Sequence, residues 1–102
     1  MEEAWYRASR LCRLLGNPVA FQVVVLLDRG GPLAPGEITR CVRRKLSTVS
    51  QTLAKLRGAE LVRYETQGRR TRYWLKQPRE TRAVLAGLLR FVRATTHLRA
   101  NR

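Results

Sequence analysis

The hydrophobic period of the chain changes after Gly58, and this change limits the folds open to it. Over residues 46–58, apolar side chains recur at the three- and four-residue spacing of an amphipathic helix. Residues 61–66 and 70–75 are instead rich in β-branched and aromatic side chains, and Gln-Gly-Arg at 67–69 lies between them as a turn. The sequence therefore predicts a helix followed directly by a β-hairpin with an arginine-rich tip.

Four more helices are predicted around this unit. An amphipathic pattern covers about residues 2–15, and the Asn-Pro pair at 17–18 starts a nearly buried helix that runs to residue 28. A short helix is expected over 35–43 and a last one over 79–98. The 102 residues suffice for one small domain. We expect a mainly α domain over 1–102 with one β-hairpin, in the order α-α-α-α-β-β-α.

Two helices joined by a short turn over about 35–58, with a hairpin over about 61–75, form the plan of a winged helix-turn-helix. The exposed side of its second helix is slim enough to enter a major groove about 12 Å wide. Gln51 lies on that side and can pair bidentately with adenine. The other candidate DNA contacts are Ser47 and Thr48 to base or phosphate, Arg43, Arg44, Lys45 and Lys55 to phosphate, and Arg69, Arg70 and Arg72 to a minor groove or the backbone.

Positive charge is concentrated on the same segment. The chain has a net charge of +14, and residues 37–76 hold 11 basic and 3 acidic side chains. Such an excess favours a polyanionic partner, which is DNA, RNA or an anionic membrane surface. The simpler alternatives are an arginine-rich composition that serves solubility, and a solvated helix beside a hairpin whose charges prevent edge aggregation.

Lys45 stands where a Ser, Thr or Asp cap is expected before the helix over 46–58. A cation there opposes the helix dipole and leaves amides uncapped, at a cost on the order of 1 kcal/mol. A DNA phosphate would satisfy both groups. The alternative is that Ser47 caps a helix that starts two residues later.

Both terminal helices, about 2–15 and 79–98, carry broad apolar faces, although a domain of this size needs few surplus ones. An interface with two-fold symmetry would bury them, which predicts a homodimer. The candidate interface residues are Trp5, Ala8, Leu11 and Leu15 on the first helix and Val84, Leu85, Leu88, Leu89 and Val92 on the last.

The segments LLGNPVAFQVVVLL, GEITRCV and STVSQTLAKLRGAELVRYETQGRRTRYWL resemble the ArsR-type winged-helix repressors. The last segment matches their pattern of S-T-V-S, L-x-x-L-x-x-x-x-L-V, G-R and a closing aromatic pair, here Tyr73-Trp74. The resemblance covers about residues 11–76 without gaps. It implies a homodimeric, operator-binding transcriptional regulator, often released from DNA by a metal or by cysteine oxidation. By position it places Ser47, Thr48, Ser50 and Gln51 on the recognition helix and Arg69 and Arg70 on the wing.

The metal-sensing positions of these repressors hold other residues in this chain. Ala34 and Gly36 stand at the positions of the Cys-x-Cys pair that senses arsenic or cadmium. The four zinc-ligand positions of the last helix hold Gln77, Arg79, Arg90 and Arg93. One amide and three guanidinium groups do not bind a cation, so neither a metal nor another cofactor is predicted.

The two cysteines leave a thiol response open. Cys12 lies on the apolar stripe of the first helix and is interpreted as a small buried hydrophobe. Cys41 lies beside Arg40, Arg43 and Arg44, whose charges favour a reactive thiolate. A Cys12–Cys41 disulfide switch is the alternative. A cysteine and the lone His97 without an orienting group do not make a catalytic site, so we predict no enzyme.

The interpretation that these features favour is a sequence-specific, dimeric transcriptional repressor that binds a double-stranded operator. The alternative is a non-specific architectural DNA- or RNA-binding protein, because Gln51 is the one obvious base reader. The apolar run over 21–27 is far shorter than the roughly 20 residues of a membrane span. The N-terminal residues lack the apolar core of a signal peptide, and two cysteines make no disulfide framework, so we expect a cytoplasmic location without membrane contact.

Overall fold

The structure is a computed structural model that describes the backbone of residues 2–100 and the side chains of residues 2–95. Within this part, the elements are α1 (Glu3–Leu15), α2 (Pro18–Gly30), α3 (Pro35–Val42), α4 (Leu46–Gly58), β1 (Val62–Gln67), β2 (Arg70–Leu75) and α5 (Pro78–Ala100). The predicted order α-α-α-α-β-β-α is confirmed, and each boundary lies within about two residues of its expected place.

Local capping explains where α2 and α3 begin. The Asn17 side-chain oxygen accepts hydrogen bonds from the amides of Val19 and Ala20 at 2.9 and 3.2 Å, so the predicted Asn cap is present. At the start of α3, the Glu37 carboxylate accepts the amide of Ala34 at 2.9 Å. Each bond satisfies a donor that the first turn of a helix leaves free.

The hairpin turns through two residues, since Gln67 pairs with Arg70 across the antiparallel β1–β2 ladder. Gly68 takes the first turn position with a φ of +62°, which a side chain would resist. The free edge of β2 is also paired: Tyr73 exchanges backbone hydrogen bonds of 3.0 and 2.8 Å with Leu33. The wing is therefore attached to the α2–α3 loop as well as to α4, which the sequence pattern did not indicate.

The hydrophobic core is built around α2, as the apolar run predicted. Val23, Val24 and Leu27 of α2 are buried against residues from α3, α4, the wing and α5. The other buried apolar residues are Ala20, Ile38, Val49, Leu53, Leu56, Leu61, Val62, Leu75 and Leu85. Leu46, which its spacing placed on the buried stripe of α4, is 56% exposed. It is the first residue of that helix, so its side chain lies beyond the end of the core.

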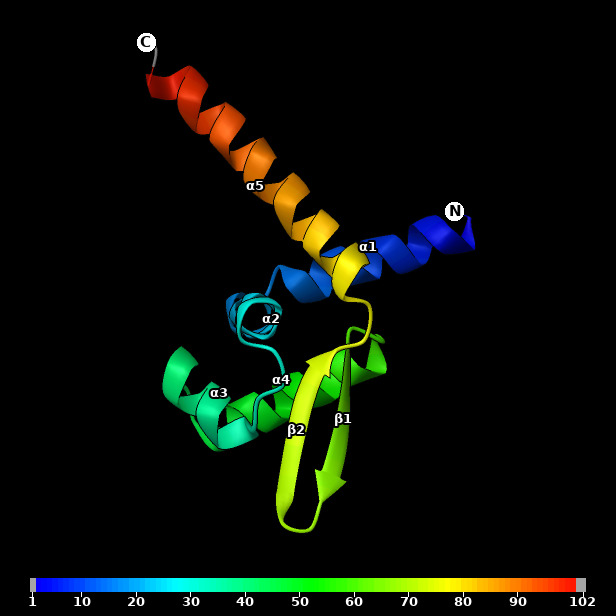
Figure 1. The fold of residues 1–102 in the computed structure, drawn as a ribbon. Coiled ribbons are helices and arrows are strands. Elements are labelled where there is room, and N and C mark those ends of the chain that lie inside the picture. The colour runs from blue at the N-terminus through cyan, green and yellow to red at the C-terminus, as the bar shows by residue number, and fades with distance from the viewer. Residues whose placement is uncertain (1, 101–102) are drawn as a thin grey trace.

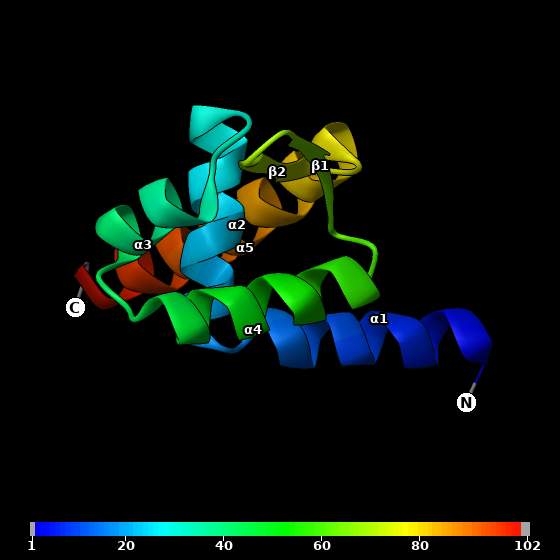
Figure 2. The same cartoon turned by 90° about the horizontal axis from the view of Figure 1, so that it is seen from below.

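The elements divide into two ends, which Figures 1 and 2 show from two sides. The helix-turn-helix, α3 and α4, lies at one end together with the hairpin, and α1 and α5 lie at the other (Figure 1). An ion pair of 3.1 Å between Arg82 and Asp28 joins the beginning of α5 to the end of α2. Beyond that point α5 extends away from the body of the domain (Figure 1).

α1 and α2 are joined at a bend of 95°. Taken as a pair they reach the length and apolar content of a membrane span, but no single helix within residues 2–100 does so.

Candidate nucleic-acid interface

α4 presents one polar side to solvent and packs the other into the core. Val49, Leu53 and Leu56 are completely buried on the inner side. The buried Thr52 hydroxyl donates a hydrogen bond of 2.8 Å to the carbonyl of Thr48, which satisfies it inside the helix. The outer side carries the exposed residues Ser47, Ser50, Gln51, Ala54 and Lys55, with Thr48 half-buried at its edge. The structure thus places the predicted recognition residues together on one accessible helix surface.

The turn between α3 and α4 consists of three exposed basic residues, Arg43, Arg44 and Lys45. Arg43 has left-handed backbone angles of φ 57° and ψ 47°, and its amide bonds to the carbonyl of Thr39 at 2.9 Å. This conformation suits glycine and costs other residues on the order of 1 kcal/mol. A strained arginine here is consistent with a site at which charge matters more than stability.

The amino end of α4 has a cation where a cap would stand. The helix begins at Leu46, Lys45 is its N-cap residue, and no described side chain accepts a hydrogen bond there. The alternative that Ser47 caps a later start is therefore wrong. The first amides of α4 thus have no side-chain cap beside the basic turn, a combination that attracts an anion.

The wing carries its arginines at the tip and on one face. Arg69 occupies the turn, and Arg70 and Arg72 are exposed on β2. Arg72 pairs in register with Glu65, whose carboxylate accepts a bond of 3.3 Å from the Gln67 amide. A shallow hollow of about 340 Å³ on this face is lined by Pro32, Glu65, Gln67, Arg70, Arg72 and Trp74. Arg69 and Arg70 at the tip are thus better placed than Arg72 to reach a groove.

The opposite face of the hairpin carries a residue pair that the sequence analysis did not identify. Tyr64 lies opposite Tyr73 in register, and their rings stack with centroids 5.4 Å apart. The guanidinium of Arg57, in the last turn of α4, lies 5.0 Å from the Tyr64 ring centroid. Helical spacing indicates only that Arg57, seven residues after Ser50, lies on the exposed side of α4.

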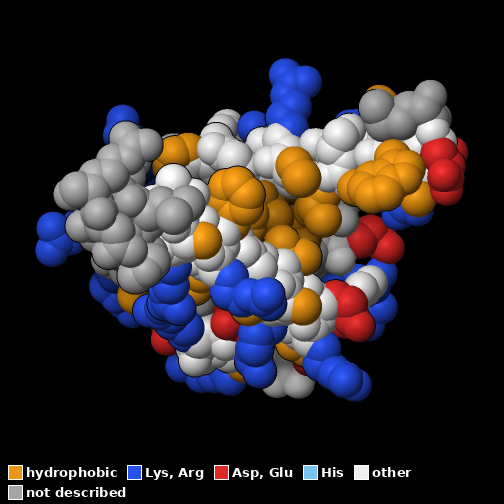
Figure 3. Space-filling model, turned by 90° about the horizontal axis from the view of Figure 1, so that it is seen from above, with side chains coloured by type: hydrophobic (Ala, Val, Ile, Leu, Met, Phe, Trp, Pro, Cys, Tyr) orange, Lys and Arg blue, Asp and Glu red, His pale blue; other side chains and the backbone are white. Residues whose placement is uncertain are grey.

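At the other end of the molecule, apolar side chains gather over α1 and α5, bordered by basic side chains and, on one side, by acidic ones (Figure 3). The expected interface residues with exposed side chains are Trp5, Val84, Leu88, Leu89 and Val92. Ala8, Leu11 and Leu15 are half-buried. Leu85 is only 7% exposed, because it faces the core of its own protomer. Its expected place in the dimer interface is therefore corrected. Phe91, at 76% exposed, belongs to the same apolar surface.

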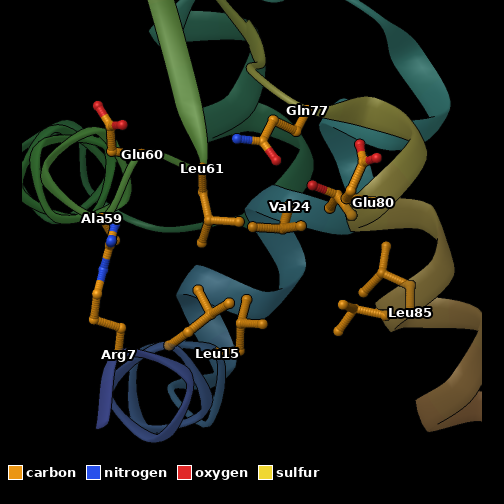
Figure 4. A pocket seen from close by; sticks show the side chains of 12 residues that line it. Arg7, Leu15, Val24, Ala59, Glu60, Leu61, Gln77, Glu80 and Leu85 are labelled. Carbon is orange, nitrogen blue, oxygen red and sulfur yellow. The ribbon is translucent and has the colours of Figure 1, made fainter. Parts of the chain in front are cut away.

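A hollow of about 220 Å³ adjoins this surface. Figure 4 shows it between Leu15 of α1, Val24 of α2, Leu61 after α4 and Leu85 of α5. Its rim is polar, with Glu60 and Glu80 among the lining residues. The apolar surface of α1 and α5 is therefore indented rather than flat.

The structure corrects one prediction for the cysteines. Cys12 is exposed in the protomer, not buried, because no described residue covers its side of α1. Cys41 is exposed on α3, and both thiols are free, so the alternative Cys12–Cys41 bond is not formed. His97 lies outside the described side chains.

Among the described residues, no three His, Cys, Asp or Glu side chains come close enough to hold a metal ion. The positions compared with metal ligands serve other purposes. Ala34 is the N-cap residue of α3, and Gln77 lines the hollow beside α5.

This arrangement matches known proteins over most of its length. Residues 15–65 match the family model of the helix-turn-helix domain. M. tuberculosis Rv0081 shares the fold, with a TM-score of 0.86 at 22% identity over 98% of this chain and 99% of that one. HlyU from Vibrio cholerae N16961 is 29% identical, with a TM-score of 0.75 over 89% of this chain and 97% of its own.

A third similar structure is the homodimeric winged helix-turn-helix DNA-binding domain (fragment 1–100) of Mb0332 from Mycobacterium bovis, a possible ArsR-family transcriptional regulator. It is 27% identical, with a TM-score of 0.74 over 93% of this chain and 84% of its own. No curated protein sequence matches at a significant level. The chain belongs to the helix-turn-helix domain family, and its winged-helix fold and sequence pattern are those of the ArsR-type transcriptional regulators.

Proposed function

We propose that the protein is a sequence-specific transcriptional repressor that binds a double-stranded operator as a homodimer. The observation that carries this proposal is the exposed side of α4. It is polar, mostly small and free of acidic residues, and basic residues flank it at the α3–α4 turn and on the wing. Such a helix enters a major groove, while the flanking charges bind the phosphates on either side.

The apolar surface of α1 and α5 supports the homodimer. Exposed apolar side chains on α1 and α5 include Trp5 at 69% and Phe91 at 76%, and large exposed apolar surfaces mark protein–protein contacts. Burial against a second copy removes both from water and places two α4 helices on one duplex. The homodimeric Mb0332 domain has this fold, which agrees with the proposal.

We assign the protein a binding role and no reaction. Cys12 and Cys41, the two thiols of the chain, lie exposed on different helices, α1 and α3. Free, exposed cysteines fit the reducing cytoplasm, where such a regulator meets its operator.

A thiol response is the regulatory part of the proposal, supported by the exposure of Cys12 and Cys41. Mild oxidation should release wild-type protein from DNA, and Cys12→Ser with Cys41→Ser should abolish that release. Zinc, cadmium and arsenite should not release DNA through residues 34, 36, 77, 79, 90 or 93. Stoichiometric zinc binding that persists in the double cysteine variant would reveal a site that these residues do not form.

The test of the proposal is selection of bound duplexes from a random pool, followed by affinity measurements at physiological salt. A specific repressor binds its selected site roughly 1,000-fold or more tightly than random duplex. The competing function is a non-specific architectural protein, which the mostly small side chains of the α4 surface favour. Equal affinity for selected and random duplexes would establish that function instead.

A further inference from the structure

Arg57, Tyr64 and Tyr73 form a continuous stack that connects the recognition helix to both strands of the wing. The Arg57 guanidinium lies 5.0 Å from the Tyr64 ring centroid. The Tyr64 ring in turn stacks on Tyr73, with centroids 5.4 Å apart and ring planes inclined by 27°. A cation over an aromatic face and an offset aromatic pair are both attractive arrangements.

The far end of this stack is firmly held. Tyr73 is paired with β1 on one edge and exchanges two backbone hydrogen bonds with Leu33 on the other. Next to the stack, toward the tip, the hydroxyls of Thr66 and Thr71 form a cross-strand hydrogen bond of 3.0 Å. The stack therefore joins a rigid hairpin to the last turn of α4.

The position of Arg57 gives this connection a consequence for DNA. For the proposed binding, α4 and the tip at Arg69 contact the same duplex at once. The hairpin projects from the carboxyl end of α4 (Figure 1). A small rotation at the base moves the tip by a larger amount. Binding through α4 and the wing tip together is strong only when the distance between them already fits the duplex.

We propose that Arg57 is a positioning residue, which sets the angle of the wing to the recognition helix through Tyr64 and Tyr73, and not a phosphate contact. This inference rests on the proposed DNA-binding function. It explains why an arginine stands at the end of α4 with its charge held over a ring. Its positive charge also lies in the last turn of α4, at the negative end of the helix dipole, where a cation is stabilising.

The test compares Arg57→Gln, Tyr64→Leu and the double variant on the selected operator over a series of salt concentrations. Each single change should weaken operator binding by roughly threefold to tenfold, because Arg57→Gln removes the cation from the Tyr64 ring and Tyr64→Leu removes that contact and the stacking on Tyr73. The double variant should bind about as well as Tyr64→Leu, since Tyr64→Leu already removes the contact between Arg57 and the ring. The salt slope, which is the change of log affinity with log salt concentration, should stay at its wild-type value, because no phosphate contact is removed.

Tyr64→Phe keeps the ring and should keep wild-type affinity. Arg10→Gln is the charge-matched control, because Arg10 lies 5.8 Å from the Tyr6 ring centroid within α1, at the other end of the molecule. It should leave operator affinity nearly unchanged. Chemical footprints should show that the stack variants lose protection beneath the wing and keep it beneath α4, which general loss of stability would not produce.

Two outcomes would overturn the inference. If Arg57→Gln reduced the salt slope by one phosphate while Tyr64→Leu bound normally, Arg57 would be a backbone contact. If the two single effects added fully in the double variant, no shared stack would exist. Hydrogen exchange of the hairpin amides, measured without DNA, tests the stack independently of the proposed DNA-binding function. Faster exchange in Tyr64→Leu supports the stack even if the wild type binds no duplex, and unchanged exchange refutes it.

Discussion

The ammonium of Lys76 lies 2.7 Å from a carboxylate oxygen of Glu60. This pair joins the residue after β2 to the short connection between α4 and β1, and so closes the base of the wing. Glu60 holds the left-handed backbone conformation, with a φ of 65°. The hydrogen bond from Lys76, and then its charge, lower the pKa of Glu60 below the ordinary value of 4.5.

Glu60→Gln should therefore reduce the free energy of unfolding near neutral pH and have no effect in strong acid. A carboxyl whose pKa is lowered by folding adds stability above its unfolded pKa, and that stability is lost as the pH falls through the folded value. The pair is exposed to solvent, so the effect should be small and should shrink in high salt. Urea unfolding at pH 7 and pH 3 measures it, with Lys76→Gln as the matched variant. An effect of equal size at both pH values would contradict this assignment.

Arg43→Gly should stabilise the fold and weaken DNA binding. Glycine adopts the left-handed conformation at this position without strain, so unfolding should cost up to about 1 kcal/mol more. Loss of the guanidinium should reduce the salt slope of operator binding by about one phosphate per subunit. Arg44→Gly is the control, since its φ is not positive, and it should weaken binding without stabilising the protein. If Arg43→Gly stabilised the protein and left DNA affinity intact, Arg43 would have no role in binding.

Leu88→Arg should convert the homodimer into monomers. Leu88 is 44% exposed within the protomer, so the new charge costs the isolated fold little but cannot be buried against a second copy. Light scattering at micromolar concentration measures the oligomeric state. The affinity for an operator with two half-sites should fall when the dimer is lost. Ala83→Arg adds the same charge to the other side of α5 and should remain dimeric. A monomeric wild type would refute the dimer.

Gln51→Ala should weaken binding to the operator by roughly 1–3 kcal/mol and to random duplex very little. Gln51 is exposed on the outer side of α4, where its amide can make two hydrogen bonds to one base. The salt slope should stay nearly unchanged. Equal losses on both duplexes would show that Gln51 reads no base.

Arg70→Ala is the contrasting change. Arg70 is exposed beside the wing tip, where its charge neutralises phosphate. The variant should weaken both complexes evenly and reduce the salt slope by about one phosphate per subunit. A changed sequence preference with an unchanged slope would mean that the wing reads the shape of a minor groove.

Features that depend on nearby residues were predictable from the sequence. The helix over 46–58 follows from apolar spacing, the start of α2 follows from Asn17 and Pro18, and the hairpin turn follows from Gly68. Each is decided by hydrogen bonds or steric limits within a few residues of chain. The location of positive charge needs no structure at all. The sequence by itself therefore determined the element order, and it limited the candidate DNA contacts to the basic and polar residues of 43–72.

Tertiary packing decided which side of each helix is covered, and periodicity alone does not contain that information. Leu85 and Leu88 share the apolar arc of α5, yet only Leu85 reaches the core, because the helix leaves the domain beyond its first turns. Leu46 and Cys12 are exposed as well, since within the described part of the chain no other element covers them. The stacking of Arg57 on Tyr64 depends on the angle at which the hairpin leaves α4. β2 is held beside the domain by contacts with α2 and by the bridge from Leu33 to Tyr73, and these partners are far away in sequence and close only after folding.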